Sequence, residues 1–100
     1  IMSQSATNCF VVTFRYQEEG LTDLAKLTGQ LTREGFVTSV TDENGVHHEL
    51  GSNSFAFITV LDQEDVQRLA QGFGQLALGK QPEVAICACK DYLQRLHTDT

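Results

Sequence analysis

Residues 42–56 read Asp-Glu-Asn-Gly-Val-His-His-Glu-Leu-Gly-Ser-Asn-Ser-Phe-Ala, and this stretch decides how the middle of the chain folds. Its Asn44-Gly45 pair is a strong hairpin signal, because both residues accept the positive φ angles of a tight turn. A two-residue turn at this point would pair Thr41 with His48. The sequence therefore predicts a reversal of the chain between these two residues.

The segment after the turn allows two structures. His47-His48-Glu49 has little strand character, and the next apolar run starts only at Phe55. We therefore expect residues 42–53 to form a flap between two strands. The alternative is a hairpin that continues into the run at Phe55, with Gly51-Ser52 as a bulge or bend.

Apolar periodicity assigns the elements on either side of this segment. Alternating and β-branched runs predict strands, and apolar residues at helical spacing predict helices. The first helix runs from Leu21 to Gly35, and the second runs from an N-cap at Asp62 to Gly79. The expected strands are 9–16, 36–41, 55–61 and 83–89, and a short C-terminal helix is expected at 91–96.

This order, βαββαβ with a short C-terminal helix, predicts an α+β fold of the ferredoxin-like kind. Such a sandwich has a four-stranded antiparallel sheet with two helices on one face. The length suffices for one domain, expected over residues 8–97. Residues 1–7 are expected to be disordered, and Ile1 is interpreted as a residue added before the natural start at Met2.

Strand alternation divides the sheet into a core face and an open face, which small domains of this kind use for dimerisation or for RNA. The core face of the first strand is expected to hold Phe10, Val12, Phe14 and Tyr16. The open face is expected to hold Val11, Thr13, Arg15, Ala85, Cys87 and Cys89. In the third strand the pattern leaves either Phe55 and Phe57 or Ala56 and Ile58 facing outward.

Composition restricts the function. The net charge is −6, with only seven Lys and Arg residues, so the chain is not one that grips nucleic-acid backbones indiscriminately. No DNA binding is expected, and any RNA site must be local. No apolar stretch is long enough to span a membrane. Three cysteines and no export signal predict a cytoplasmic location, with the cysteines as small apolar residues of the sheet.

The paired histidines are the first candidate for chemistry. His47 and His48 beside Glu49 offer the acid and the base that metal-free RNA cleavage needs. The simpler interpretation is that both are solvated loop residues. Asp42 and Glu43 could hold a divalent ion beside the flap, but the sequence assigns no definite cofactor.

Cations and aromatics supply two further candidates. Lys26 and Arg33 share a helix face that could flank Arg15, and cations there could hold a phosphate and stabilise its developing charge. Phe55 could stack on an RNA base. The simpler explanations are that Lys26 and Arg33 are ordinary solvated charges on a helix and that Phe55 is a core residue.

Four blocks of this sequence together resemble the GhoS family of antitoxins. They are Phe10-Val11-Val12-Thr13-Phe14-Arg15-Tyr16, Thr41-Asp42-Glu43-Asn44-Gly45, Leu50-x-x-Asn53-Ser54-Phe55-Ala56 and Asp91-Tyr92-Leu93. Their spacing matches across residues 8–97. Lys26 and His48 match basic positions of the family, whereas Arg15 stands where related nucleases carry an aspartate.

The resemblance implies a type V toxin–antitoxin antitoxin, a sequence-selective endoribonuclease that cleaves the messenger RNA of a small membrane toxin. On this hypothesis His48 and Arg15 are catalytic, and Lys26, Arg33, His47 and Phe55 bind RNA. The protein would act as a monomer or homodimer. The alternative is a non-catalytic module that binds RNA or protein through the open sheet face.

Overall fold

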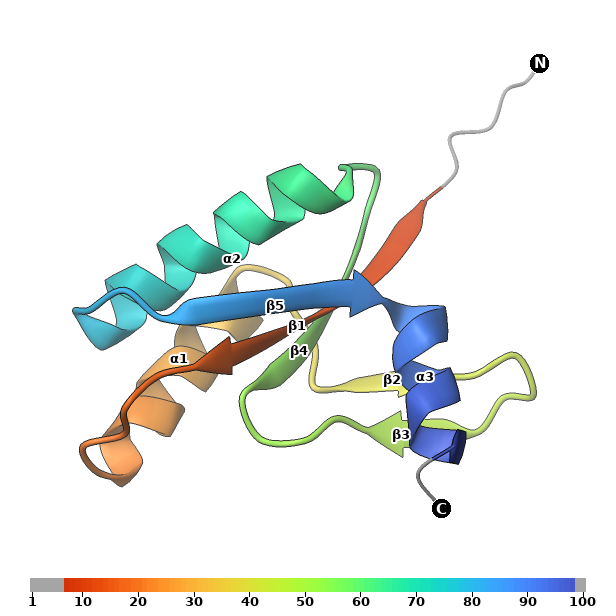
Figure 1. Ribbon diagram of the computed structural model, residues 1–100, viewed down its shortest axis with the longest axis horizontal. Coiled ribbons are helices and arrows are strands. Elements are labelled where there is room, and N and C mark those ends of the chain that lie inside the picture. The colour runs from red at the N-terminus through yellow and green to blue at the C-terminus, as the bar shows by residue number, and fades with distance from the viewer. Residues whose placement is uncertain (1–6, 99–100) are drawn as a thin grey trace.

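The computed structural model describes residues 7–98, and Figure 1 shows their arrangement. We expect disorder for residues 1–7, and all of these except Thr7 lie outside the described range. The elements in chain order are β1 (Asn8–Arg15), α1 (Leu21–Arg33), β2 (Ser39–Thr41), β3 (His47–Glu49), β4 (Ser54–Thr59), α2 (Gln63–Leu78), β5 (Glu83–Ala88) and α3 (Cys89–Thr98).

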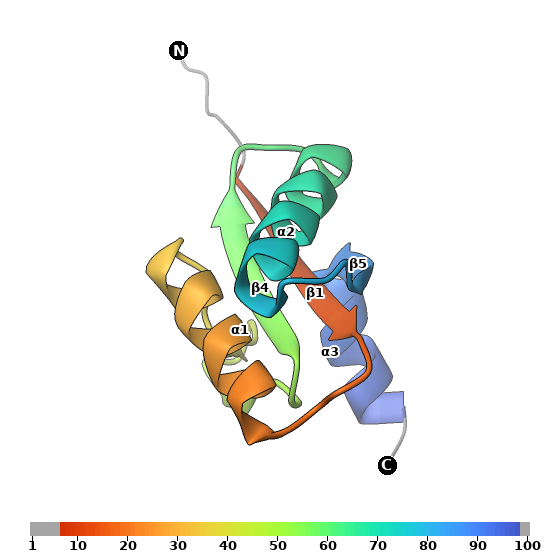
Figure 2. The same ribbon diagram turned by 90° about the vertical axis from the view of Figure 1, so that its left-hand side faces the viewer.

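The central strand of the main sheet is β1. The strand order is β4-β1-β5, and both pairs are antiparallel. Phe10, Val12 and Phe14 are buried against α1 and α2, which cover one face of the sheet (Figure 2). The predicted core face of this strand is therefore confirmed, and so is the mixed α+β class.

Both long helices bury an apolar stripe and end where the sequence indicates. Asp62 caps α2, because its side chain accepts a hydrogen bond of 2.9 Å from the N–H of Asp65. Gly79 ends α2 in the left-handed region, with φ 73°. Leu21, expected to begin the apolar stripe of α1, is 89% exposed. The buried stripe residues are Leu27, Leu31, Val66 and Ala70.

Close packing of α2 on β1 depends on Gly74. A Cβ atom there would lie 2.7 Å from Phe14 Cε2, whereas one at Gly72 would meet nothing within 4 Å. We expect Gly74→Ala to lower the free energy of unfolding by about 1–3 kcal/mol through overpacking. Gly72→Ala is expected to raise it by up to about 1 kcal/mol through helix propensity. Urea denaturation of both variants measures this difference, and equal effects would contradict the close contact.

The second predicted strand does not run along the main sheet. Val37 and Ala56 form one isolated bridge, with N–H···O distances of 2.8 Å in both directions. Beyond this bridge the chain leaves β4, and β2 pairs with β3 in a separate two-stranded ribbon. The main sheet has three strands, so the expected ferredoxin-like arrangement of four strands is not confirmed.

Residues 42–53 are not the unpaired flap that we expected. His47–Glu49 form β3 and pair with β2, because backbone pairing and the turn before them outweigh the weak strand propensity of these residues. The N–H of Asp42 donates a hydrogen bond of 2.9 Å to the carbonyl oxygen of Val46, which leaves three loop residues between them rather than two. Thr41 therefore lies opposite His47 instead of His48. Gly45, with φ 81°, supplies the left-handed residue that such a loop requires.

The outer face of the sheet is partly covered by α3, opposite α1 and α2 (Figure 2). Val11 is 1% exposed and packs in one cluster with Cys89, Tyr92 and Leu93. The prediction of an open face is therefore wrong for this part of the sheet. It holds for Arg15 at the far end of β1, which is exposed.

Two of the three cysteines are bonded to each other. The pairing of β1 with β5 places Cys9 and Cys89 just beyond the last strand pair, with their Cα atoms 5.3 Å apart, and their sulfur atoms form a disulfide. The prediction that they are simple apolar residues is therefore wrong. Cys87 is a free, half-buried thiol.

Candidate functional site

The hairpin between β2 and β3 is organised by Asp42. Its Oδ1 accepts hydrogen bonds from the N–H groups of Asn44 and Val46, both at 2.9 Å. Its Oδ2 lies 2.9 Å from Nε2 of His48. A single carboxylate therefore holds both the turn and the imidazole ring.

The two adjacent histidines differ in their surroundings, because successive strand residues point to opposite sides. The side chain of His48 is 19% exposed and that of Asp42 is 12% exposed. The side chain of His47 is 64% exposed, with Nδ1 3.4 Å from Oγ1 of Thr41 and Nε2 4.0 Å from Glu49. The histidines therefore do not form the acid and base of one site.

The hydrogen bond from His48 lowers the pKa of Asp42 below its usual value, and the N–H groups of Val46 and Asn44 add to this effect. A carboxyl whose pKa is lowered by folding stabilises the protein above its unfolded-state pKa. That stabilisation is lost as the pH falls through the lowered value.

We therefore expect the hairpin to lose order in acid, below about pH 4. We also expect His48→Ala to raise the pKa of Asp42. NMR titration of the Asp42 carboxyl carbon in the wild type and the variant measures both. An Asp42 pKa that does not change in His48→Ala would contradict the assignment of this hydrogen bond as the main cause.

A cavity of about 660 Å³ lies between this hairpin, the outer face of the sheet and α3. This volume falls within the range of about 300–1,000 Å³ that is typical of ligand sites. Part of its apolar wall is open to solvent, because Val37 is 45% exposed and Ile58 is 65% exposed. The lining residues are Cys9, Val37, Ser39, Val40, Thr41, Asp42, Glu43, Asn44, Ala56, Ile58, Cys89, Lys90, Leu93 and Gln94.

Within the described part of the chain, Lys90 is the one cationic residue that lines this cavity. It lies in the first turn of α3 and is exposed, and no described carboxylate lies within 4 Å of it. By contrast, Arg15, Arg68 and Lys80 each have a carboxylate partner. Lys90 is therefore available to bind an anion at the cavity.

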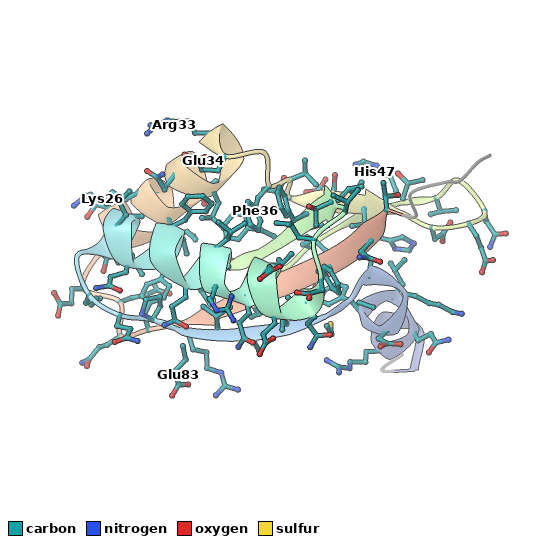
Figure 3. All side chains as sticks on the ribbon, turned by 90° about the horizontal axis from the view of Figure 1, so that it is seen from above. Lys26, Arg33, Glu34, Phe36, His47 and Glu83 are labelled. Atoms are coloured by element: carbon teal, nitrogen blue, oxygen red, sulfur yellow. A yellow bond between two sulfur atoms is a disulfide. The ribbon has the colours of Figure 1, made fainter. Side chains whose placement is uncertain are left out.

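The cations predicted for the site do not meet the histidines. Figure 3 shows Lys26 and Arg33 on α1, apart from His47 on β3. Arg15 lies six residues beyond Cys9 along β1, which places it roughly 20 Å from the cavity end of the strand. Its guanidinium lies 3.9 Å from Glu83. These three cations therefore do not join the histidines in one site, and the hypothesis that Lys26 and Arg33 hold a phosphate together with Arg15 stays a prediction.

The predicted base-stacking residue is also misplaced. Phe55 is 2% exposed and contacts Phe14 in the core, with the ring centroids 5.9 Å apart. It faces α1 and α2 because β4 turns Phe55 and Phe57 inward and Ala56 and Ile58 outward. Among the described residues, no three His, Cys, Asp or Glu side chains gather in a way that could hold a metal ion.

The sequence did not point to Lys90 or to the cavity. Lys90 and Asn44 are far apart in the chain, and they line the same cavity only because α3 folds back over the sheet. The C-terminal helix was expected to start at residue 91, which left Lys90 outside any element. Only the Asp42-to-Gly45 turn was a local signal for this site.

Comparison with known proteins gives a family match. Residues 2–95 match the family model described as Endoribonuclease GhoS. The chain is 37% identical over 83 residues to the uncharacterized protein YdiZ of Escherichia coli (strain K12), an alignment that covers 83% of this chain and 86% of that protein. The protein of the same name from Escherichia coli O157:H7 matches to the same extent. Among the described residues, no helix is long and apolar enough to cross a membrane.

Proposed function

Because the chain belongs to the GhoS family of endoribonucleases, we propose that it cleaves RNA and that the cavity between the hairpin, the sheet and α3 binds its substrate. The family match supports the reaction. The observation that supports the place is the position of Asp42, which lines this cavity and whose Oδ2 lies 2.9 Å from Nε2 of His48. As a finer proposal, the substrate is the messenger RNA of a small membrane toxin. The protein would then act in the cytoplasm as the antitoxin.

The cavity suits an unpaired stretch of RNA. Proteins that read RNA sequence mostly bind single-stranded segments, whose bases can leave the stack. The exposed aliphatic wall formed by Val37 and Ile58 can contact a base, and the amide of Asn44 can hydrogen-bond to its edge. Lys90 can pair with the adjoining phosphate. With a net charge of −6, one local contact of this kind is the form of RNA binding that the chain can support.

The chemistry is assigned to His48. A carboxylate that accepts a hydrogen bond from an imidazole fixes the orientation of the ring, an arrangement that general acid–base catalysis uses. Asp42 does this for His48 at 2.9 Å, and Asp42 itself lines the cavity. Arg15, about 20 Å away along β1, is not part of this proposal. His47, whose ring lies in different surroundings, is not part of it either.

Incubation of the purified protein with single-stranded transcripts tests the proposal. The transcripts should include that of a neighbouring gene for a short membrane peptide, if one is present. Parallel reactions contain EDTA, magnesium or manganese. We expect discrete cleavage products and preferred sites, and transcripts that stay intact under every condition would overturn the proposed reaction.

A non-catalytic RNA-binding or protein-interaction role is the second candidate. The observation that favours it is the exposed apolar surface at Val37 and Ile58 beside the cavity. Saturable RNA binding that is not followed by cleavage and is weakened by Lys90→Glu would support an RNA-binding module. Lys26→Glu is the matched control, since it makes the same charge change on α1.

A further inference from the structure

All three cysteines lie at one end of the main sheet. Cys9 and Cys89 follow the strand pair Phe10–Ala88, and Cys87 lies opposite Val11 one step earlier in the ladder. Both bonded cysteines line the cavity. The disulfide therefore forms part of the wall of the proposed RNA site.

We propose that the Cys9–Cys89 bond is a thiol–disulfide exchange site, through which a small cellular thiol releases α3 and weakens RNA binding at the cavity. This inference rests on the proposed function for two parts, the binding of RNA and the cytoplasmic location. In a reducing compartment, disulfides are typically transient and sensory rather than structural. The chemical change and the release of α3 can be tested without RNA.

The two sulfur atoms differ in access. Cys89 is 7% exposed, whereas Cys9 is half-buried, and both face the cavity. A thiolate of the small thiol attacks Sγ of Cys9, the S–S bond breaks, and Sγ of Cys89 leaves as a thiolate that takes up a proton. A second thiolate attacks the mixed disulfide and releases Cys9 as a thiol. Two small thiols are thereby oxidised to one small disulfide, and the protein gains two thiols.

The bond connects the start of β1 to the first residue of α3. Among the described side chains, Tyr92 and Leu93 of this helix pack in the cluster that holds Val11, and the Tyr92 hydroxyl accepts a hydrogen bond of 3.4 Å from the N–H of Gly51 in the loop after β3. The first turns of α3 also carry Lys90 into the cavity wall. Loss of the covalent connection therefore loosens the wall that holds the proposed phosphate contact.

The third thiol does not replace this connection. Burial is the main cause that raises the pKa of Cys87, so at neutral pH this residue is mostly a thiol rather than the thiolate that attacks disulfides. Cys87 lies outside the cavity lining. It is therefore a useful internal reference for alkylation, and Cys87→Ala is a matched control that keeps the bond.

The first experiment counts thiols and measures the release of α3. The full-length protein is equilibrated with oxidised or reduced glutathione, alkylated and weighed by mass spectrometry, while hydrogen exchange is followed residue by residue. We expect one alkylated cysteine in the oxidised form and three in the reduced form. Amide protection should fall in α3 and persist in α1 and α2. Equal protection of α3 in both forms, or three reactive thiols in the oxidised form, would overturn the proposal.

The second experiment measures RNA affinity in the same two forms. We expect reduction to weaken binding by about tenfold, within the usual range of coupling between sites. Cys87→Ala should keep this response. Cys9→Ala/Cys89→Ala, with folding checked by circular dichroism, should bind weakly in both forms. Equal affinity of the two wild-type forms would overturn the coupling, whereas no binding in any form, with α3 still released, would count against the proposed function instead.

Discussion

Replacing His48 by glutamine is expected to lower the rate of RNA cleavage by about 10²- to 10⁴-fold while the hairpin stays folded. A glutamine amide can donate a hydrogen bond to Asp42 in place of the imidazole, but it cannot transfer a proton near neutral pH. The change therefore separates the chemistry of the ring from its structural contact. Single-turnover cleavage of one RNA by both proteins measures the effect, and NMR shifts of the hairpin report whether its fold is kept.

His47→Gln is the matched control, because it makes the same change on the adjacent residue with different surroundings. Its cleavage rate should stay close to that of the wild type. A pH–rate profile of the wild type should show a limb that His48→Gln removes. A His48→Gln variant that cleaves RNA at the wild-type rate would refute the catalytic role of His48. Equal losses of rate in His48→Gln and His47→Gln would indicate that activity depends on the β2–β3 ribbon as a whole and not on the His48 ring.

Phe14→Ala is expected to lower the free energy of unfolding by about 3–5 kcal/mol. Its ring is 2% exposed, lies edge-to-face on Phe55, and fills the space beside Gly74 that a Cβ atom there would enter. Removal of the ring leaves a cavity between β1 and α2 that the backbone of both elements holds open. Urea denaturation measures the loss.

Leu76→Ala provides the control for this prediction. Leu76 lies on α2 but is 71% exposed, so its truncation should change the free energy of unfolding by no more than about 0.5 kcal/mol.

The effects of substitutions at Phe14 and Gly74 are expected to be coupled. Phe14→Leu should reduce the loss of stability caused by Gly74→Ala if the two side chains compete for one space. Additive effects of the pair would contradict that contact.

Strand alternation predicted β1 well, because its large residues occupy every second position and this strand is central. The same rule could not orient β4, where Phe55, Ala56, Phe57 and Ile58 are all apolar. Both faces of β4 then looked equally suited to the core. The choice followed from packing, since Phe57 stacks on Phe36 with ring centroids 4.3 Å apart.

The turn at Asn44-Gly45 was visible in the sequence, but its consequences were not. Asp42 looked like an ordinary turn acid or a weak metal ligand. In the folded chain its carboxylate binds two backbone N–H groups and His48. The backbone of β2 completed the pairing that gave His47–Glu49 the structure of a strand.

The sequence by itself determined the two long helices, the caps of α2, the core face of β1 and the family likeness, because each depends on residues close in the chain or on a period that one element repeats. Only the tertiary structure decided the path of residues 42–56. It separated Arg15 and Lys26 from the histidines, buried Phe55, joined Cys9 to Cys89 and brought Lys90 to the hairpin. These outcomes depend on how α3 and the ribbon pack against the sheet, and no local pattern records that packing.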